Sequence, residues 1–157
     1  MGATIFTVRT WLAILLGLFF SAGSNAQSKK IVFVCEHGSA KSIIAISYFN
    51  KIAKGRNLSW EAVSRGTTPD AEISAKTKKL LTDDHMPIPQ VKPQAITQKD
   101  IDEADHVILF FPLPENIEGR DNLEHWPGID AVNGDFQKLR DDIVAKLLPL
   151  IDSLEHQ

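Results

Sequence analysis

Four residues that could support catalysis lie close together after an apolar run. The stretch IVFVCEHGSAKS, residues 31–42, contains the only cysteine of the chain, Cys35, and then Gly38, Lys41 and Ser42. A thiolate is a strong nucleophile, glycine permits the positive φ that a tight anion-binding loop needs, and lysine brings a cation to a bound anion. The spacing therefore indicates a loop that binds a phosphate-like oxyanion, with a nucleophile at its edge.

The elements on either side would place this loop where ligands gather in α/β proteins. Residues 29–35 form a short, β-branched apolar run, which is typical of a strand covered on both faces. After Ser42, apolar side chains recur at helical spacing as far as Gly55. A loop between a strand end and a helix start can turn backbone N–H groups inward, and the helix N-terminus adds partial positive charge. That field favours the thiolate form of a nearby cysteine.

Three residues of this stretch have alternative interpretations. Cys35 could be a small apolar residue that closes a buried strand. His37 could be a solvent-facing residue of which only the backbone N–H matters, or it could add a pH-dependent donor. Ser42 could cap the following helix or donate a hydrogen bond to the sulfur.

Strands and helices alternate along the rest of the chain. Besides the strand at 29–35, we expect strands at residues 58–64 and 104–110, and a brief one near 90–93, where prolines argue for an edge or a loop. This order predicts an α/β three-layer sandwich in which helices flank a mostly parallel sheet of about four strands.

Caps and turn residues predict the remaining helices. Asp70 would cap one helix, and residues 97–103, which begin with Thr97, have the pattern of a second, short capped helix. Residues 111–134 are rich in Pro, Gly, Asn and Asp, so we expect a long functional loop. Asp135 would cap the last helix, which Pro149 should kink or end early.

Residues 1–26 have the order of a secretory signal peptide. Arg9 precedes an apolar stretch, and small residues end at Ala26. The apolar stretch, residues 11–20, is shorter than the roughly 20 residues that a helix needs to cross a bilayer, so we expect no stable membrane anchor after cleavage. The mature protein would be one domain, residues 27–157, in a bacterial periplasm or secreted.

Composition and charge argue against several classes of function. With 157 residues, 43% of them apolar, the chain can form one domain with an ordinary core. Of the 17 basic residues only Arg9 lies in the first 26 positions, so 16 basic and 20 acidic residues remain, and a net charge of −4 does not favour nucleic-acid binding. His85, His106 and His125 lack metal-ligand spacing, so we expect no metal and no cofactor.

The loop and several later segments resemble one enzyme family. A cysteine, five residues, a basic residue and a serine are similar to the signature loop of the low-molecular-weight protein tyrosine phosphatases and the related thiol-dependent arsenate reductases. VSRGTTPD resembles the family's second strand and turn, and EADHVILF resembles a later strand. EHWPGID and FQKLRDDI resemble the acid loop and closing helix of the arsenate-reductase branch. The resemblance covers nearly the whole mature chain.

The resemblance implies a role for each matching residue. Cys35 would be the nucleophile, Ser42 the partner of its thiolate, and Asp130, four residues after Trp126, the general acid. The oxyanion loop would consist of Glu36, His37, Gly38, Ser39, Ala40 and Lys41. Asp130 has an alternative interpretation as a turn residue after Gly128.

Two departures from the family pattern separate three hypotheses about function. Lys41 stands where the family has arginine, and an ammonium lacks the planar fork that holds two phosphate oxygens. Besides Cys35 there is no cysteine to resolve an oxidised thiol within the chain. The leading hypothesis is a phosphatase-like enzyme that hydrolyses phosphomonoesters, including protein phosphotyrosine, through a cysteinyl-phosphate. The alternatives are an arsenate reductase that uses an external thiol and a non-catalytic oxyanion-binding module.

The signal peptide can be tested by protein sequencing. Cleavage after Ala26 predicts that material released from the cytoplasm begins at Gln27, often in cyclised form. Recovery of a soluble cytosolic protein that still begins at Met1 would contradict the prediction.

Overall fold

The β-branched run before the oxyanion loop forms a central strand in the computed structural model of the protein, which describes residues 28–156. The predicted signal peptide, residues 1–26, lies outside the described residues. In chain order, the elements are β1 (Lys29–Cys35), α1 (Lys41–Gly55), β2 (Trp60–Gly66), α2 (Ala75–Asp83), α3 (Gln98–Glu103), β3 (His106–Leu109), β4 (Leu123–His125), the 3-10 turn η1 (Val132–Gly134) and α4 (Phe136–Leu154). Among residues 28–156, no helix is long and apolar enough to cross a membrane.

The strands form one sheet in the order β2-β1-β3-β4, and every pair is parallel. The predicted α/β three-layer sandwich is therefore confirmed, with a sheet that is entirely parallel. Cys35 at the end of β1 is level with Gly66 at the end of β2, and Val34 is level with Leu109 of β3. The carboxyl ends of these three strands therefore lie at one edge of the sheet, which is where the oxyanion loop begins.

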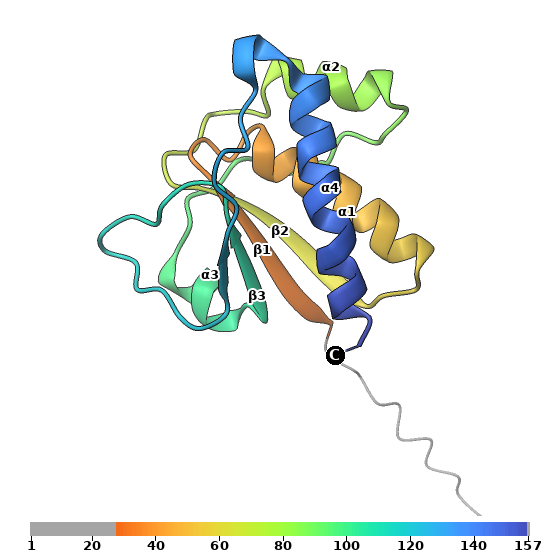
Figure 1. The fold of residues 1–157 in the computed structure, drawn as a ribbon. Coiled ribbons are helices and arrows are strands. Elements are labelled where there is room, and N and C mark those ends of the chain that lie inside the picture. The colour runs from red at the N-terminus through yellow and green to blue at the C-terminus, as the bar shows by residue number, and fades with distance from the viewer. Residues whose placement is uncertain (1–27, 157) are drawn as a thin grey trace, which may run out of the picture.

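Neighbouring residues of β1 point to opposite faces of the sheet, as the period of a strand requires. Ile31, Phe33 and Cys35 belong to the apolar cluster that α1 and α4 complete, whereas Val32 and Val34 belong to the cluster that includes α3. Figure 1 shows α1 and α4 on one side of the sheet and α3 on the other. Because both faces are covered, the sequence of β1 is a continuous apolar run rather than an alternating one.

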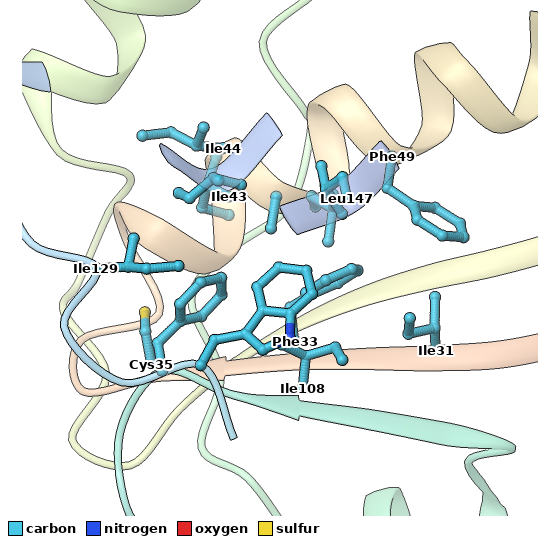
Figure 2. Close-up of a cluster of buried hydrophobic side chains, with 14 of the residues drawn as sticks. Ile31, Phe33, Cys35, Ile43, Ile44, Phe49, Ile108, Ile129 and Leu147 are labelled. Atoms are coloured by element: carbon cyan, nitrogen blue, oxygen red, sulfur yellow. The ribbon is translucent and has the colours of Figure 1, made fainter. Parts of the chain in front are cut away.

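Aromatic rings fill the core beneath the loop. Phe33 packs against Phe49, Phe110 and Trp126, with ring centroids 5.8, 6.5 and 6.3 Å apart. Full burial of a side chain such as Phe33 contributes about 1.5–3 kcal/mol to folding. Figure 2 shows Cys35 at one end of this buried cluster, so a buried core supports the residue that carries the thiol.

The fourth strand is not the predicted one. Residues 90–93 form no strand, and the sheet ends instead at β4, inside the segment 111–134 that the sequence indicates as a loop. β4 has only three residues, none of them buried, so it leaves no apolar pattern in the sequence. Pairing with β3 holds it in place, together with a hydrogen bond of 2.9 Å from the Val107 N–H to the Asn122 carbonyl.

One of the three predicted helix caps is wrong. Asp70 does not cap α2. Ser74 does, because its hydroxyl accepts a hydrogen bond from the N–H of Thr77 at 3.1 Å. The other two helix starts are confirmed: Thr97 begins α3 with a capping box, and Asp135 accepts a hydrogen bond in the first turn of α4.

Pro149 does not end the last helix. α4 continues to Leu154, because buried side chains on both sides of the proline, including Leu150 and Ile151, hold the final turns against the core. Pro149 and Ala145 are both exposed, so water can hydrate the Ala145 carbonyl that lacks a helical N–H partner.

Tyr48, Asp84 and Arg140 connect three helices. Tyr48 of α1 donates its hydroxyl hydrogen to the carboxylate of Asp84, which follows α2. Arg140 of α4 donates to both oxygens of that carboxylate, at 2.8 and 2.7 Å. Burial and, after it, the hydrogen bond and negative charge of Asp84 raise the pKa of Tyr48 to about 12. The folded protein therefore favours the neutral hydroxyl.

Because Tyr48 is the only tyrosine of the chain, its ionisation can be measured directly by the absorbance of tyrosinate. We expect a midpoint at about pH 12 in the folded protein and at about pH 10 in denaturant. A pKa that folding raises makes the protein lose stability as the pH rises from about 10 to 12. Tyr48→Phe should remove the part of this stability loss that arises from ionisation of Tyr48. A midpoint near 10 while circular dichroism still shows folded protein would contradict this account.

Candidate active site

The oxyanion loop, residues 36–41, connects the end of β1 to the start of α1. Cys35 is a free thiol and is 2% exposed. The N-cap residue of α1 is Ala40, and no side chain caps the helix. Ser42 therefore does not cap the helix, which was one of its two possible roles. The first N–H groups of α1 have no intrahelical partner, and their partial positive charge lies at the loop.

A second segment holds the carbonyl groups of the loop. The brace segment, residues 66–74, extends from the last residue of β2 toward α2. Its backbone N–H groups donate four hydrogen bonds to carbonyls of residues 35–39: Thr67 to Cys35 at 3.0 Å, Thr68 to Glu36 at 2.7 Å, Asp70 to His37 at 3.0 Å and Ser74 to Ser39 at 3.1 Å.

These hydrogen bonds determine the direction of the loop N–H groups. No peptide bond among the described residues is cis, and in a trans peptide unit the C=O and the following N–H point in opposite directions. The carbonyls point toward the brace segment, so the N–H groups of Glu36, His37, Gly38 and Ala40 point away from it. The Gly38 N–H lies on the side of the thiol, because it donates to Cys35 Sγ at 3.2 Å. The loop therefore presents several N–H donors beside Cys35, as an oxyanion site requires.

A chain of hydroxyl groups reaches the thiol from β2. Ser64 donates to Ser42 Oγ at 2.8 Å, and Ser42 Oγ lies 3.1 Å from Cys35 Sγ. Since Ser42 accepts from Ser64, its own hydrogen is free to point to the sulfur. Sequence reasoning included Ser42 but missed Ser64. Ser64 lies opposite Phe33 in the parallel pairing of β1 with β2. This position could be predicted only after the register of the two strands was known.

Two glycines allow the loop and the brace segment to approach closely. Gly38 has φ +62°, and a Cβ at this position would lie 3.1 Å from the nitrogen of Gly66. A Cβ on Gly66 would lie only 2.8 Å from the nitrogen of Gly38. The left-handed backbone expected at Gly38 is thus present, and side chains at either position would push the two segments apart.

The structure brings Lys41 and Asp130 together. Lys41 Nζ donates to Asp130 Oδ1 at 2.6 Å, across 89 positions of the sequence. Ile129 is buried beside Asp130. Trp126, which is 1% exposed, fixes the start of the segment that carries Asp130, because its backbone N–H donates to the Leu109 carbonyl at 2.9 Å. The cation and the acid that the sequence predicts therefore lie at the same edge of the loop, paired with each other.

The other loop side chains face outward or toward the brace segment. The His37 ring is half exposed and lies 3.6 Å from Glu36 and 3.7 Å from Asp70. Ser39 is 2% exposed and donates to Asp70 Oδ2 at 2.5 Å. Glu36 and His37 thus contribute backbone N–H groups while their side chains remain at the surface. In the described part of the chain, no group of three or more His, Cys, Asp or Glu side chains is arranged to hold a metal ion.

One protein family profile matches the sequence of the chain. A family profile described as Low molecular weight phosphotyrosine protein phosphatase matches residues 30–112, which is more than half of the chain. The match begins at the second residue of β1, includes the oxyanion loop and the brace segment, and ends after β3. None of the curated proteins compared with the chain matches it significantly.

Solved structures share the fold. A thioredoxin-dependent arsenate reductase from Corynebacterium glutamicum is 20% identical with a TM-score of 0.71 over 83% of this chain, which spans only 64% of that protein. A protein tyrosine phosphatase from Entamoeba histolytica is 16% identical, with a TM-score of 0.71 over 83% of this chain and 97% of that one. A low molecular weight protein tyrosine phosphatase from T. tengcongensis is 20% identical, with a TM-score of 0.64 over 82% and 99%. At these identities the similarity establishes the fold alone.

The close approach of the two glycines can be tested by alanine substitution. Gly38→Ala should cost about 2–3 kcal/mol of unfolding free energy, because it combines a left-handed residue with a contact to Gly66. Gly128→Ala is the matched control: its φ is +74° and nothing lies within 4 Å of the added Cβ, so it should cost about 1 kcal/mol. Urea unfolding measures both values, and equal losses would contradict the packing argument.

Proposed function

Because this chain belongs to the low molecular weight phosphotyrosine protein phosphatase family, we propose that it hydrolyses phosphomonoesters at Cys35 through a cysteinyl-phosphate. The family binds phosphate-like oxyanions, and the proposal places that anion among the N–H groups of the oxyanion loop. One observation carries the proposal: the brace segment holds the carbonyls of residues 35, 36, 37 and 39, so the opposite side of the loop presents N–H donors next to a thiol.

The proposed reaction has two steps. The Cys35 thiolate attacks phosphorus, the bond from phosphorus to the leaving oxygen breaks, and Asp130 protonates that oxygen. Water then attacks the cysteinyl-phosphate, Asp130 accepts a proton from the water, and the phosphorus–sulfur bond breaks to release phosphate and the thiolate. Ser42 supports the thiolate in both steps, since its hydroxyl is positioned by Ser64 to donate to the sulfur.

The pairing of Lys41 with Asp130 constrains this cycle. Lys41 Nζ donates to Asp130 Oδ1, so this oxygen can deliver a proton to the leaving oxygen only after the pair separates. A bound dianion competes with Asp130 for the ammonium of Lys41 and thereby favours separation. Lysine also lacks the planar fork of arginine, so we expect this site to bind an oxyanion better than it turns one over.

Two other functions are compatible with the same site. An arsenate reductase would form a bond from Cys35 Sγ to arsenic while an arsenic–oxygen bond breaks and that oxygen leaves as water. An external thiol would then attack Sγ, so that the sulfur–arsenic electron pair stays on arsenic, arsenite leaves, and Cys35 forms a mixed disulfide with the thiol. A second external thiol would release Cys35 from this disulfide, because Cys35 is the only cysteine of the chain. The fold similarity to the reductase from Corynebacterium glutamicum favours including this activity in the test. A non-catalytic oxyanion-binding module is favoured by the Lys41–Asp130 pair, which occupies both groups that catalysis needs.

We also propose that the protein acts in a bacterial periplasm or outside the cell. The support is the sequence of residues 1–26, in which a basic residue, an apolar stretch and small residues follow in the order of a signal peptide.

Three assays on the purified protein separate the functions: hydrolysis of an aryl phosphate, thiol-dependent reduction of arsenate, and binding of inorganic phosphate by calorimetry. A phosphatase should lose hydrolysis completely in Cys35→Ser, since serine is a far weaker nucleophile at neutral pH. Arsenate reduction without phosphate-ester hydrolysis would identify the reductase. Phosphate binding with neither reaction would identify the binding module, and absence of phosphate binding together with absence of both reactions would contradict all three.

Lys41→Arg tests the role assigned to the lysine. Restoring a planar fork should raise the turnover number by about 10²-fold, which is the usual effect of one transition-state donor. Lys79→Arg is the matched control, because Lys79 pairs with Asp83 on the surface of α2 and should leave turnover unchanged. An unchanged or lower rate in Lys41→Arg would contradict this role.

A further inference from the structure

Asp70 is tied to the oxyanion loop although it lies outside the loop. Its Oδ2 accepts a hydrogen bond from Ser39 Oγ at 2.5 Å, and its backbone N–H donates to the His37 carbonyl at 3.0 Å. Its other carboxylate oxygen lies 3.7 Å from the His37 ring. The carboxylate itself is about half exposed, so the hydrogen bond from Ser39 connects a buried hydroxyl of the loop to the surface of the brace segment.

The brace segment holds both the side-chain hydroxyl and the backbone carbonyl of Ser39. The Ser39 hydroxyl donates to Asp70, and the Ser39 carbonyl accepts from the Ser74 N–H at 3.1 Å. The Ser39 carbonyl and the Ala40 N–H belong to the same peptide unit, and Ala40 is the N-cap residue of α1. The orientation of Ser39 therefore sets the direction of a loop N–H donor. A hydrogen bond to a carboxylate is among the stronger ones in proteins, so it can fix this orientation.

We propose that Asp70 is a positioning residue, which acts through Ser39 to hold the oxyanion loop in the geometry that binds an oxyanion. The inference rests on the proposed function, because it assigns Asp70 to the same site. Asp70 does not touch the reacting atoms. Its contribution is to the alignment of the loop N–H groups before the anion arrives, which lowers the cost of binding.

Asp70 could affect anion binding in two ways, by repelling the anion through its charge or by holding the loop through its hydrogen bond to Ser39, and the two effects have opposite signs. A carboxylate near an anion site repels the anion, so its removal would tighten binding if charge were its only effect. A positioning role predicts the opposite sign, because the loop would lose its alignment. Asp70→Asn separates the two, since the amide oxygen still accepts the Ser39 hydrogen bond while the charge is gone.

The test measures the affinity for inorganic phosphate by calorimetry on the purified protein. We expect Asp70→Ala to weaken binding about tenfold, and Asp70→Asn to stay within about twofold of the wild type. Glu72→Ala is the matched control, because Glu72 is an exposed carboxylate of the same segment that pairs with Lys78 and should leave binding unchanged. Tighter or unchanged binding in Asp70→Ala would overturn the inference.

A double-mutant cycle tests whether Asp70 acts through Ser39. Ser39→Ala should weaken phosphate binding by a similar factor, and the double variant Ser39→Ala with Asp70→Ala should be no weaker than either single variant. Additive losses would show that Asp70 acts by another route. If Asp70→Ala fails to fold, Ser39→Ala and Asp70→Asn still give the comparison.

A measurement on the free protein separates failure of this inference from failure of the proposed function. Amide hydrogen exchange should be faster in residues 36–41 of Asp70→Ala, unchanged in α4, and unchanged in Glu72→Ala. If the wild type neither binds phosphate nor hydrolyses the aryl phosphate, the proposed function fails, and exchange alone decides whether Asp70 holds the loop. Equal exchange of residues 36–41 in Asp70→Ala and the wild type would overturn the inference whatever the binding result.

Discussion

The hydrogen bonds from the brace segment to the carbonyls of the oxyanion loop are the interaction on which the site depends. In a trans peptide unit the C=O and the N–H point in opposite directions, so hydrogen bonds that hold the carbonyls on one side of the loop place the N–H groups on the other side. The loop therefore presents its donors while the titratable side chains among residues 36–40, those of Glu36 and His37, remain half exposed at the surface. The uncapped start of α1 adds its partial positive charge to the same place.

The rest of the fold maintains this arrangement. The parallel pairing of β1 with β2 makes Cys35 and Gly66 level, so the loop and the brace segment leave the sheet side by side. Gly38 and Gly66 then permit an approach that a Cβ on either residue would obstruct. Both faces of β1 are covered, and the buried rings of Phe33 and Trp126 connect the strand that carries the thiol to the segment that carries Asp130.

Local patterns predicted the parts of the structure that local chemistry decides. The apolar run at 29–35, the caps at Thr97 and Asp135 and the left-handed Gly38 follow from propensity and hydrogen bonding within a few residues. Features that depend on contacts between residues far apart in the chain could not be predicted from the sequence. β4 is too short to show a period, and the roles of Ser64 and Asp70 emerge only when β2 and the brace segment lie beside the loop. Asp70 resembles a helix cap in sequence because the same side chain that accepts from a loop hydroxyl could accept from a helix N–H.

The central claim is that an oxyanion binds to the N–H groups of the oxyanion loop rather than to surface lysines. The most direct test is to follow the backbone amide resonances of the isotope-labelled protein by NMR while inorganic phosphate is added. The account predicts saturable shifts at Glu36, Gly38 and Ala40, with smaller changes at Asp130 as Lys41 turns to the anion. Shifts confined to exposed lysines such as Lys76 and Lys79, with none in the loop, would contradict it.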